Sequence, residues 1–140
     1  MQIVRRPLAP GETDQELVWL TISSSGVTLA ATWLALGLPW PVCLFHQITG
    51  NPCLTCGATR SAIAFFRAHF LAAFEWNPLA FLCYCGLTLF NAYALAVIVT
   101  RSPRLRLAHI TASERKLIRG AAIAILALNW GYVLVANPSL

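Results

Sequence analysis

The run LAFLCYCGLTLFNAYALAVIVT, residues 79–100, decides the fold class of this chain. It contains no charged residue, and a transmembrane helix needs about 20 consecutive, mostly apolar residues. It follows Asn77-Pro78 and precedes Arg101-Ser102-Pro103, and the residue before a proline is disfavoured in a helix. We therefore predict a membrane-spanning helix over residues 79–100.

Two further apolar runs flank this helix, at residues 17–38 and 117–136. The first stops at Pro39, and the second is preceded by Thr111-Ala112-Ser113-Glu114, which has the spacing of a capping box. The third helix should therefore begin in water near Thr111. The predicted fold class is an all-α integral membrane protein, a single membrane domain over residues 1–140 with three transmembrane helices at 17–38, 79–100 and 117–136.

The composition excludes several classes of protein. The chain has 140 residues, of which 58% are hydrophobic and 11% charged, whereas an average soluble domain has about 25% charged residues. A globule of this size buries a limited fraction of its surface, so a soluble globular enzyme, a disordered protein and a coiled coil all fit poorly. The net charge of +5 bears on membrane orientation and is not interpreted as nucleic-acid binding.

The distribution of Lys and Arg predicts the orientation, because cytoplasmic segments of membrane proteins are enriched in these residues. Residues 39–78 contain only Arg60 and Arg67. We therefore expect the tail 1–16 and the loop 101–116 to be cytoplasmic, and the segment 39–78 and the tail 137–140 to face outward. The basic residues of the cytoplasmic segments are Arg5, Arg6, Arg101, Arg104, Arg106, Arg115 and Lys116.

The outward segment 39–78 should contain a cysteine-rich loop followed by a short helix. Residues 61–75 have helical spacing of apolar residues, but this stretch is too short to cross a bilayer. We expect an interfacial or re-entrant helix there. Asn91 and Asn129 fall near the middle of their predicted spans, where an unpaired amide is costly, so we expect them to bond each other or a partner subunit.

Three of the five cysteines, Cys43, Cys53 and Cys56, lie in the loop. Four interpretations remain open: a structural disulfide in an oxidising compartment, a metal site, a redox-active pair, and inert buried thiols. In a metal site, His46 would join the three cysteines as a Cys3His ligand set. In the third, Arg60 and the following helix lower the pKa of a C-x-x-C thiol.

Three residues after the cysteines have expected structural roles. Gly57 should permit a tight turn, and Thr59 should cap the interfacial helix. Arg60 should clamp loop carbonyls or a lipid phosphate.

The loop resembles a widespread bacterial family of small membrane proteins that is catalogued as a domain of unknown function. The family core reads C-P, then T-G-x-x-C-P-x-C-G-x-T-R, then a short helix and N-P-L. This chain matches it at Cys43, at residues 49–60 and at residues 77–79, with Leu44 and Leu54 where the family usually has proline. The resemblance implies a bacterial inner-membrane protein and no stated activity. It also implies that six residues act as one unit: Cys43, Cys53, Cys56, Gly57, Thr59 and Arg60.

These features favour a non-catalytic protein, and no catalytic residue or cofactor is assigned. We expect an accessory or scaffold subunit of a larger membrane complex, with the loop stapled by a disulfide as a docking surface. The alternative is a thiol-redox or metal-binding protein, for zinc or copper, that uses the C-x-x-C cluster. The expected partners are the lipid bilayer and other membrane subunits, not nucleic acid.

Overall fold

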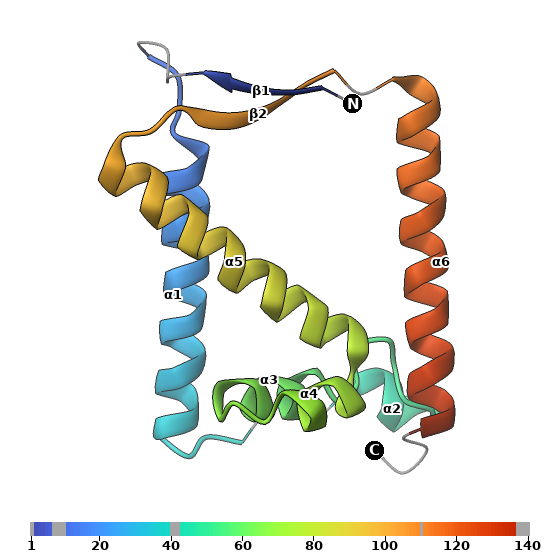
Figure 1. The fold of residues 1–140 in the computed structure, drawn as a ribbon. Coiled ribbons are helices and arrows are strands. Elements are labelled where there is room, and N and C mark those ends of the chain that lie inside the picture. The colour runs from blue at the N-terminus through green and yellow to red at the C-terminus, as the bar shows by residue number, and fades with distance from the viewer. Residues whose placement is uncertain (1, 7–10, 40–42, 110, 137–140) are drawn as a thin grey trace. The chain divides into compact units, whose positions relative to one another are not determined.

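The computed structural model describes residues 2–6, 11–39, 43–109 and 111–136, so the predicted tail 137–140 lies outside the described residues. Figure 1 shows the order of the elements. They are β1 (Gln2–Arg6), α1 (Gln15–Ala35), α2 (Leu44–Thr49), α3 (Ala58–Phe66), α4 (Phe70–Trp76), α5 (Pro78–Thr100), β2 (Arg104–His109) and α6 (Ala112–Ala136).

Helices α5 and α6 are long and apolar enough to cross a membrane. Only 11% of the most apolar window of each helix is buried inside the protein, whereas the core helix of a soluble protein would be mostly buried. The predicted helices over 79–100 and 117–136 are therefore confirmed as apolar helices. The predicted capping box is also present, because the Thr111 backbone N–H donates to Glu114 Oε2 (2.9 Å) and the Glu114 N–H donates to Thr111 Oγ1 (3.3 Å).

The prediction of three spans needs correction, because two described helices meet the length and hydropathy of a membrane span and α1 is not one of them. The run 17–38 does fold as a helix, which ends at Ala35. Six Ser and Thr residues interrupt its apolar positions and lower its hydropathy. They are Thr21, Ser23, Ser24, Ser25, Thr28 and Thr32.

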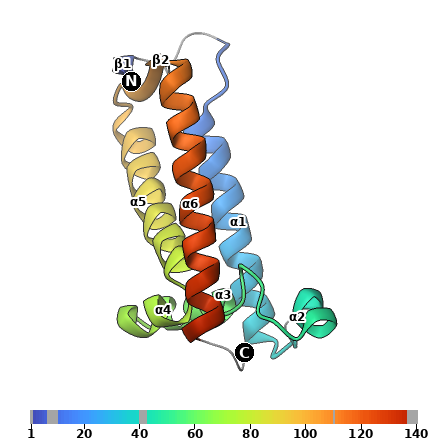
Figure 2. The same ribbon diagram turned by 90° about the vertical axis from the view of Figure 1, so that its right-hand side faces the viewer.

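A two-stranded antiparallel ribbon joins the two basic segments, which the sequence analysis treated as a tail and a loop without strands. In β1 and β2, Arg5 pairs with Leu105 and Arg6 with Arg104, and the strands run side by side in Figures 1 and 2. The stretch RLRLAH alternates basic and apolar residues with the two-residue period of a strand. That alternation was a signal for β2.

The chain divides into two compact units. The first comprises Met1–Trp40 and Leu87–Arg115, and in it the Ser23 hydroxyl donates to Asn91 Oδ1 (2.7 Å), which links α1 to α5. The second comprises Pro41–Gly86 and Lys116–Leu140 and contains the cysteine loop.

The predicted helix over 61–75 is two helices, α3 and α4. The chain turns at Ala68, whose φ of 59° is left-handed. The His69 N–H bonds the Ala64 carbonyl (2.9 Å) and the Ala68 N–H bonds the Phe65 carbonyl (3.0 Å), which together form a Schellman motif that ends α3. The Ser61 hydroxyl then donates to the Ala73 carbonyl (2.7 Å) and ties α3 to α4.

Candidate functional site

Three thiol groups converge in the second unit. The sulfur atoms of Cys43, Cys53 and Cys56 all lie within 4.8 Å of one another. Cys53 is central: its sulfur is 3.2 Å from that of Cys43 and 3.3 Å from that of Cys56. All three residues are partly buried and carry free thiols, and we call them the cysteine cluster.

Local backbone structure brings these sulfurs together. Cys43 is the N-cap of α2, and α2 ends at Gly50, which has a φ of 71° and donates to the His46 carbonyl (2.9 Å). A turn then closes between Cys53 and Cys56, in which the Cys56 N–H bonds the Cys53 carbonyl (3.1 Å). Gly57 follows this turn directly and is the N-cap of α3. Its φ of 81° is left-handed, a conformation that glycine adopts at little steric cost.

The two thiols of the turn differ in acidity. Burial by itself would raise the pKa of Cys53, but hydrogen bonds from Thr55, Cys43 and Cys56 to its thiolate outweigh burial and lower the pKa to about 7. Burial raises the pKa of Cys56, and its hydrogen bond with Cys53 raises it further, to about 12. At neutral pH the cluster therefore holds one readily ionised sulfur flanked by thiol donors.

Three side chains hold the carbonyl groups of the loop. Asn77 Nδ2 donates to the carbonyls of Leu54 (3.2 Å) and Cys56 (3.0 Å). From α6, Asn129 Nδ2 donates to the same Leu54 carbonyl (3.3 Å), and the Trp130 indole N–H donates to the Pro52 carbonyl (3.1 Å). We call Asn77, Asn129 and Trp130 the loop clamp.

The amides of the loop clamp are also bonded on their oxygen side. Asn77 Oδ1 accepts from the Ala80 N–H (3.0 Å). Asn77 thereby caps the N-terminus of α5, in which Pro78 occupies the first helical position. Asn129 Oδ1 accepts from the Leu79 N–H (3.0 Å). Asn77 is 1% exposed and Asn129 6% exposed. Irregular backbone away from water needs such donors, so these amides determine the path of the cysteine loop.

Two amides thus have partners other than the expected ones. From the sequence, Asn91 and Asn129 were expected to bond each other or a partner subunit. Asn91 accepts from Ser23, while Asn129 bonds Leu54 and Leu79.

The remaining predicted residues are not part of the cysteine cluster. Arg60 is exposed and its guanidinium lies over the Trp76 ring, 4.8 Å from the centroid. Gly57, rather than the expected Thr59, is the N-cap of α3. His46 lies outside the group of converging ligand atoms, as do Cys83 and Cys85 on α5.

The sequence did not lead us to Trp130 or to the roles of both clamp amides. The Asn77-Pro78 pair could have indicated the capping role of Asn77, because Asn at the N-cap and Pro at the next position are typical of a helix start. Trp130 carried no such signal, because its indole reaches a carbonyl 78 positions earlier in the chain.

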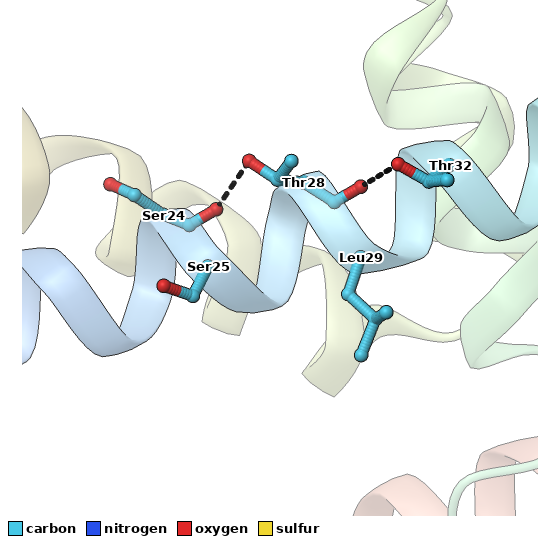
Figure 3. A pocket seen from close by; sticks show the side chains of 5 residues that line it. All are labelled: Ser24, Ser25, Thr28, Leu29 and Thr32. Carbon is cyan, nitrogen blue, oxygen red and sulfur yellow. Dashed lines mark hydrogen bonds between the residues drawn. The ribbon is translucent and has the colours of Figure 1, made fainter.

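Helix α1 has a shallow hollow lined by Ser24, Ser25, Thr28, Leu29 and Thr32 (Figure 3). The hydroxyls of Thr28 and Thr32 donate to the carbonyls of Ser24 (2.8 Å) and Thr28 (2.9 Å) in the same helix. Because these hydroxyls are already satisfied, the hollow suits helix packing better than ligand binding.

Comparison with known proteins finds one family model that matches the segment containing the loop, and it assigns no function. Residues 43–91 match the model of a family described as "Protein of unknown function (DUF2752)". The matched segment contains the cysteine cluster and Asn77, whereas Asn129 and Trp130 lie beyond it. The expected resemblance to a domain of unknown function is confirmed. No curated protein and no solved structure matches the chain.

Proposed function

We propose that this chain, whose cysteine loop lies in a segment shared with a family of unknown function, is a small membrane protein that binds a thiophilic metal ion through Cys43, Cys53 and Cys56. The convergence of three sulfurs within 4.8 Å carries the proposal. Thiolates favour zinc and monovalent copper among the biological metals.

The spacing of the sulfurs supports this function. A tetrahedral zinc ion with Zn–S bonds of about 2.3 Å holds its sulfurs about 3.8 Å apart. Two sulfur–sulfur distances in the cysteine cluster are 3.2 and 3.3 Å and all are within 4.8 Å, so small shifts would seat an ion. A sulfur with a pKa of about 7, at Cys53, gives the ion one thiolate ligand at neutral pH.

The membrane setting is part of the proposal. Helices α5 and α6 are apolar and largely unburied, which favours insertion into a bilayer. The β ribbon brings the N-terminal basic segment beside the basic connection before α6, which favours one cytoplasmic side for both. With α5 crossing the membrane, the cysteine cluster would face outward from a bacterial inner membrane, and so would the C-terminus after α6.

Metal analysis of the full-length chain tests the metal site. The protein is purified in detergent without oxygen, and bound zinc and copper are counted against free thiols. We expect one ion per chain, lost in Cys43→Ser, Cys53→Ser and Cys56→Ser. The control Cys83→Ser should keep the ion, because this thiol lies outside the cysteine cluster. A reduced protein that takes up neither metal would refute the proposal.

A second candidate function is an accessory or scaffold subunit, supported by uncovered small-residue positions on α6. Gly120 and Gly131 are exposed, and an added Cβ at either would meet no atom within 4 Å. Helices in lipid associate through such faces. Copurification of a membrane partner with the wild type, and its loss in Gly131→Leu, would support this function. A chain that runs alone after gentle extraction would contradict it.

In this second candidate function, a disulfide would staple the cysteine loop. Cys43 and Cys53 would lose two protons and two electrons to a disulfide-type oxidant, which is reduced to two thiols. Their sulfurs are 3.2 Å apart as free thiols. Counting thiols in protein extracted from membranes with an alkylating agent distinguishes the two candidates, because a stable disulfide removes two of the three metal ligands.

A further inference from the structure

His46 has a buried ring nitrogen with no partner. Its Nδ1 is shielded from solvent and makes no hydrogen bond, the one buried side-chain nitrogen or oxygen in this condition among the residues described. Native structures rarely leave such an atom unsatisfied, and each exception calls for an explanation, of which strain, a catalytic role and an absent water or ion are the usual ones. An unprotonated imidazole nitrogen offers a lone pair that a metal ion can accept.

The position of His46 in the chain relates it to the cysteine cluster. It lies in the first turn of α2, three residues after Cys43, the N-cap of that helix. Cys53 and Cys56 are also three residues apart, at the turn before α3. The ligands would therefore come as two short pairs, C-x-x-H and C-x-x-C, and paired ligands at close spacing are typical of structural zinc sites.

Three sulfurs alone leave a tetrahedral ion one ligand short. Zinc in structural sites is almost always four-coordinate, and Cys3His is one of its common ligand sets. The three sulfurs already lie within reach of one another. To complete a Cys3His set, the ion needs one neutral nitrogen ligand. His46 is partly buried, belongs to the same compact unit and has the unpartnered nitrogen.

We infer that the ion bound by the cysteine cluster is zinc and that His46 Nδ1 is its fourth ligand. The inference rests on the proposed metal-binding function and adds the identity of the metal and of the last ligand. Binding would turn the imidazole toward the sulfurs and give the buried nitrogen its missing partner.

X-ray absorption on the zinc-loaded full-length protein tests the ligand set. The expected first shell has three sulfurs at about 2.3 Å and one nitrogen at about 2.0–2.1 Å. In His46→Ala the nitrogen should be lost and zinc affinity should fall at least about 10-fold, the scale on which even outer-shell changes act. The control His69→Ala, at the N-cap of α4, should match the wild type.

A second variant keeps the test informative if His46→Ala fails to fold. His46→Cys should bind zinc tightly and show four sulfurs. Three sulfurs with an oxygen ligand, unchanged in His46→Ala, would overturn the role of His46 and leave the three-thiol site standing. Uptake of copper but not zinc would overturn the identity of the metal. Failure to take up either ion would overturn the proposed function itself.

Discussion

Replacing Asn129 with leucine should loosen the cysteine loop while leaving helix α6 intact. Leucine has the branched shape of asparagine, although its methyl groups are bulkier, and it is the better helix former. The substitution removes the hydrogen bond to the Leu54 carbonyl (3.3 Å) and the one from the Leu79 N–H (3.0 Å). The Leu54 carbonyl keeps its bond from Asn77 (3.2 Å), so the Leu79 N–H is the group that loses its side-chain partner.

The magnitude follows from these two bonds. Loss of one ordinary hydrogen bond costs about 1 kcal/mol, and a buried donor left without a partner costs about 1–3 kcal/mol. Asn129 is 6% exposed, so water does not readily replace it. We expect the free energy of unfolding to fall by about 2–4 kcal/mol in total.

Unfolding of the protein in mixed micelles by a denaturing detergent measures this change, and alkylation of the loop cysteines reports on local opening. The matched control is Asn91→Leu, which removes an amide that bonds Ser23 in the other unit. Its loop thiols should react at the wild-type rate, whereas those of Asn129→Leu should react faster. Wild-type stability and thiol reactivity in Asn129→Leu would refute the reasoning that α6 holds the loop.

Two further predictions concern single side chains of the site. In the reduced, metal-free protein, the alkylation rate of Cys53 should rise with pH and reach half its maximum near pH 7, because the pKa of Cys53 is lowered from 9.0 to about 7. Cys56, with a pKa of about 12, should stay protonated and react slowly. Mass mapping of the labelled residues against pH checks this, and a Cys53 midpoint near pH 9 would contradict it. Trp130→Phe should cost about 1 kcal/mol of stability in the same micelle titration, since it removes one hydrogen bond to a loop carbonyl. Trp19→Phe, at a side chain 58% exposed, is the control, and equal losses in both variants would argue against the indole bond.

Local patterns predicted much of the fold because their causes lie within a few residues. The capping box at Thr111 formed as expected, since its donors and acceptors are three residues apart. The helix over 61–75 was wrong because Ala68 adopts a left-handed conformation that alanine rarely takes, and composition does not signal it. The ribbon of β1 and β2 was missed although β2 alternates, because pairing with a distant strand decides whether a short alternating run becomes a strand.

In the candidate site, too, the features with local causes were predictable and those that depend on distant contacts were not. The three cysteines of the cluster were predictable from the sequence, because C-x-x-C and one nearby cysteine suffice to suggest a common site. Arg60 was expected to clamp loop carbonyls or a lipid phosphate, and in the structure its guanidinium lies over the Trp76 ring. The loop clamp holds the loop carbonyls, and two of its members come from α6, more than 70 residues along the chain.

By itself, the sequence determined where apolar helices form, where α6 begins and which thiols are candidates, because hydropathy, capping and short spacing act along neighbouring residues. Only the tertiary structure decided that Asn129 and Trp130 reach the loop, that Asn91 bonds Ser23, and that His46 Nδ1 is buried without a partner. The physical reason is that a buried polar group bonds whatever donor or acceptor the packing brings near it, and packing joins residues whose separation in sequence carries no signal.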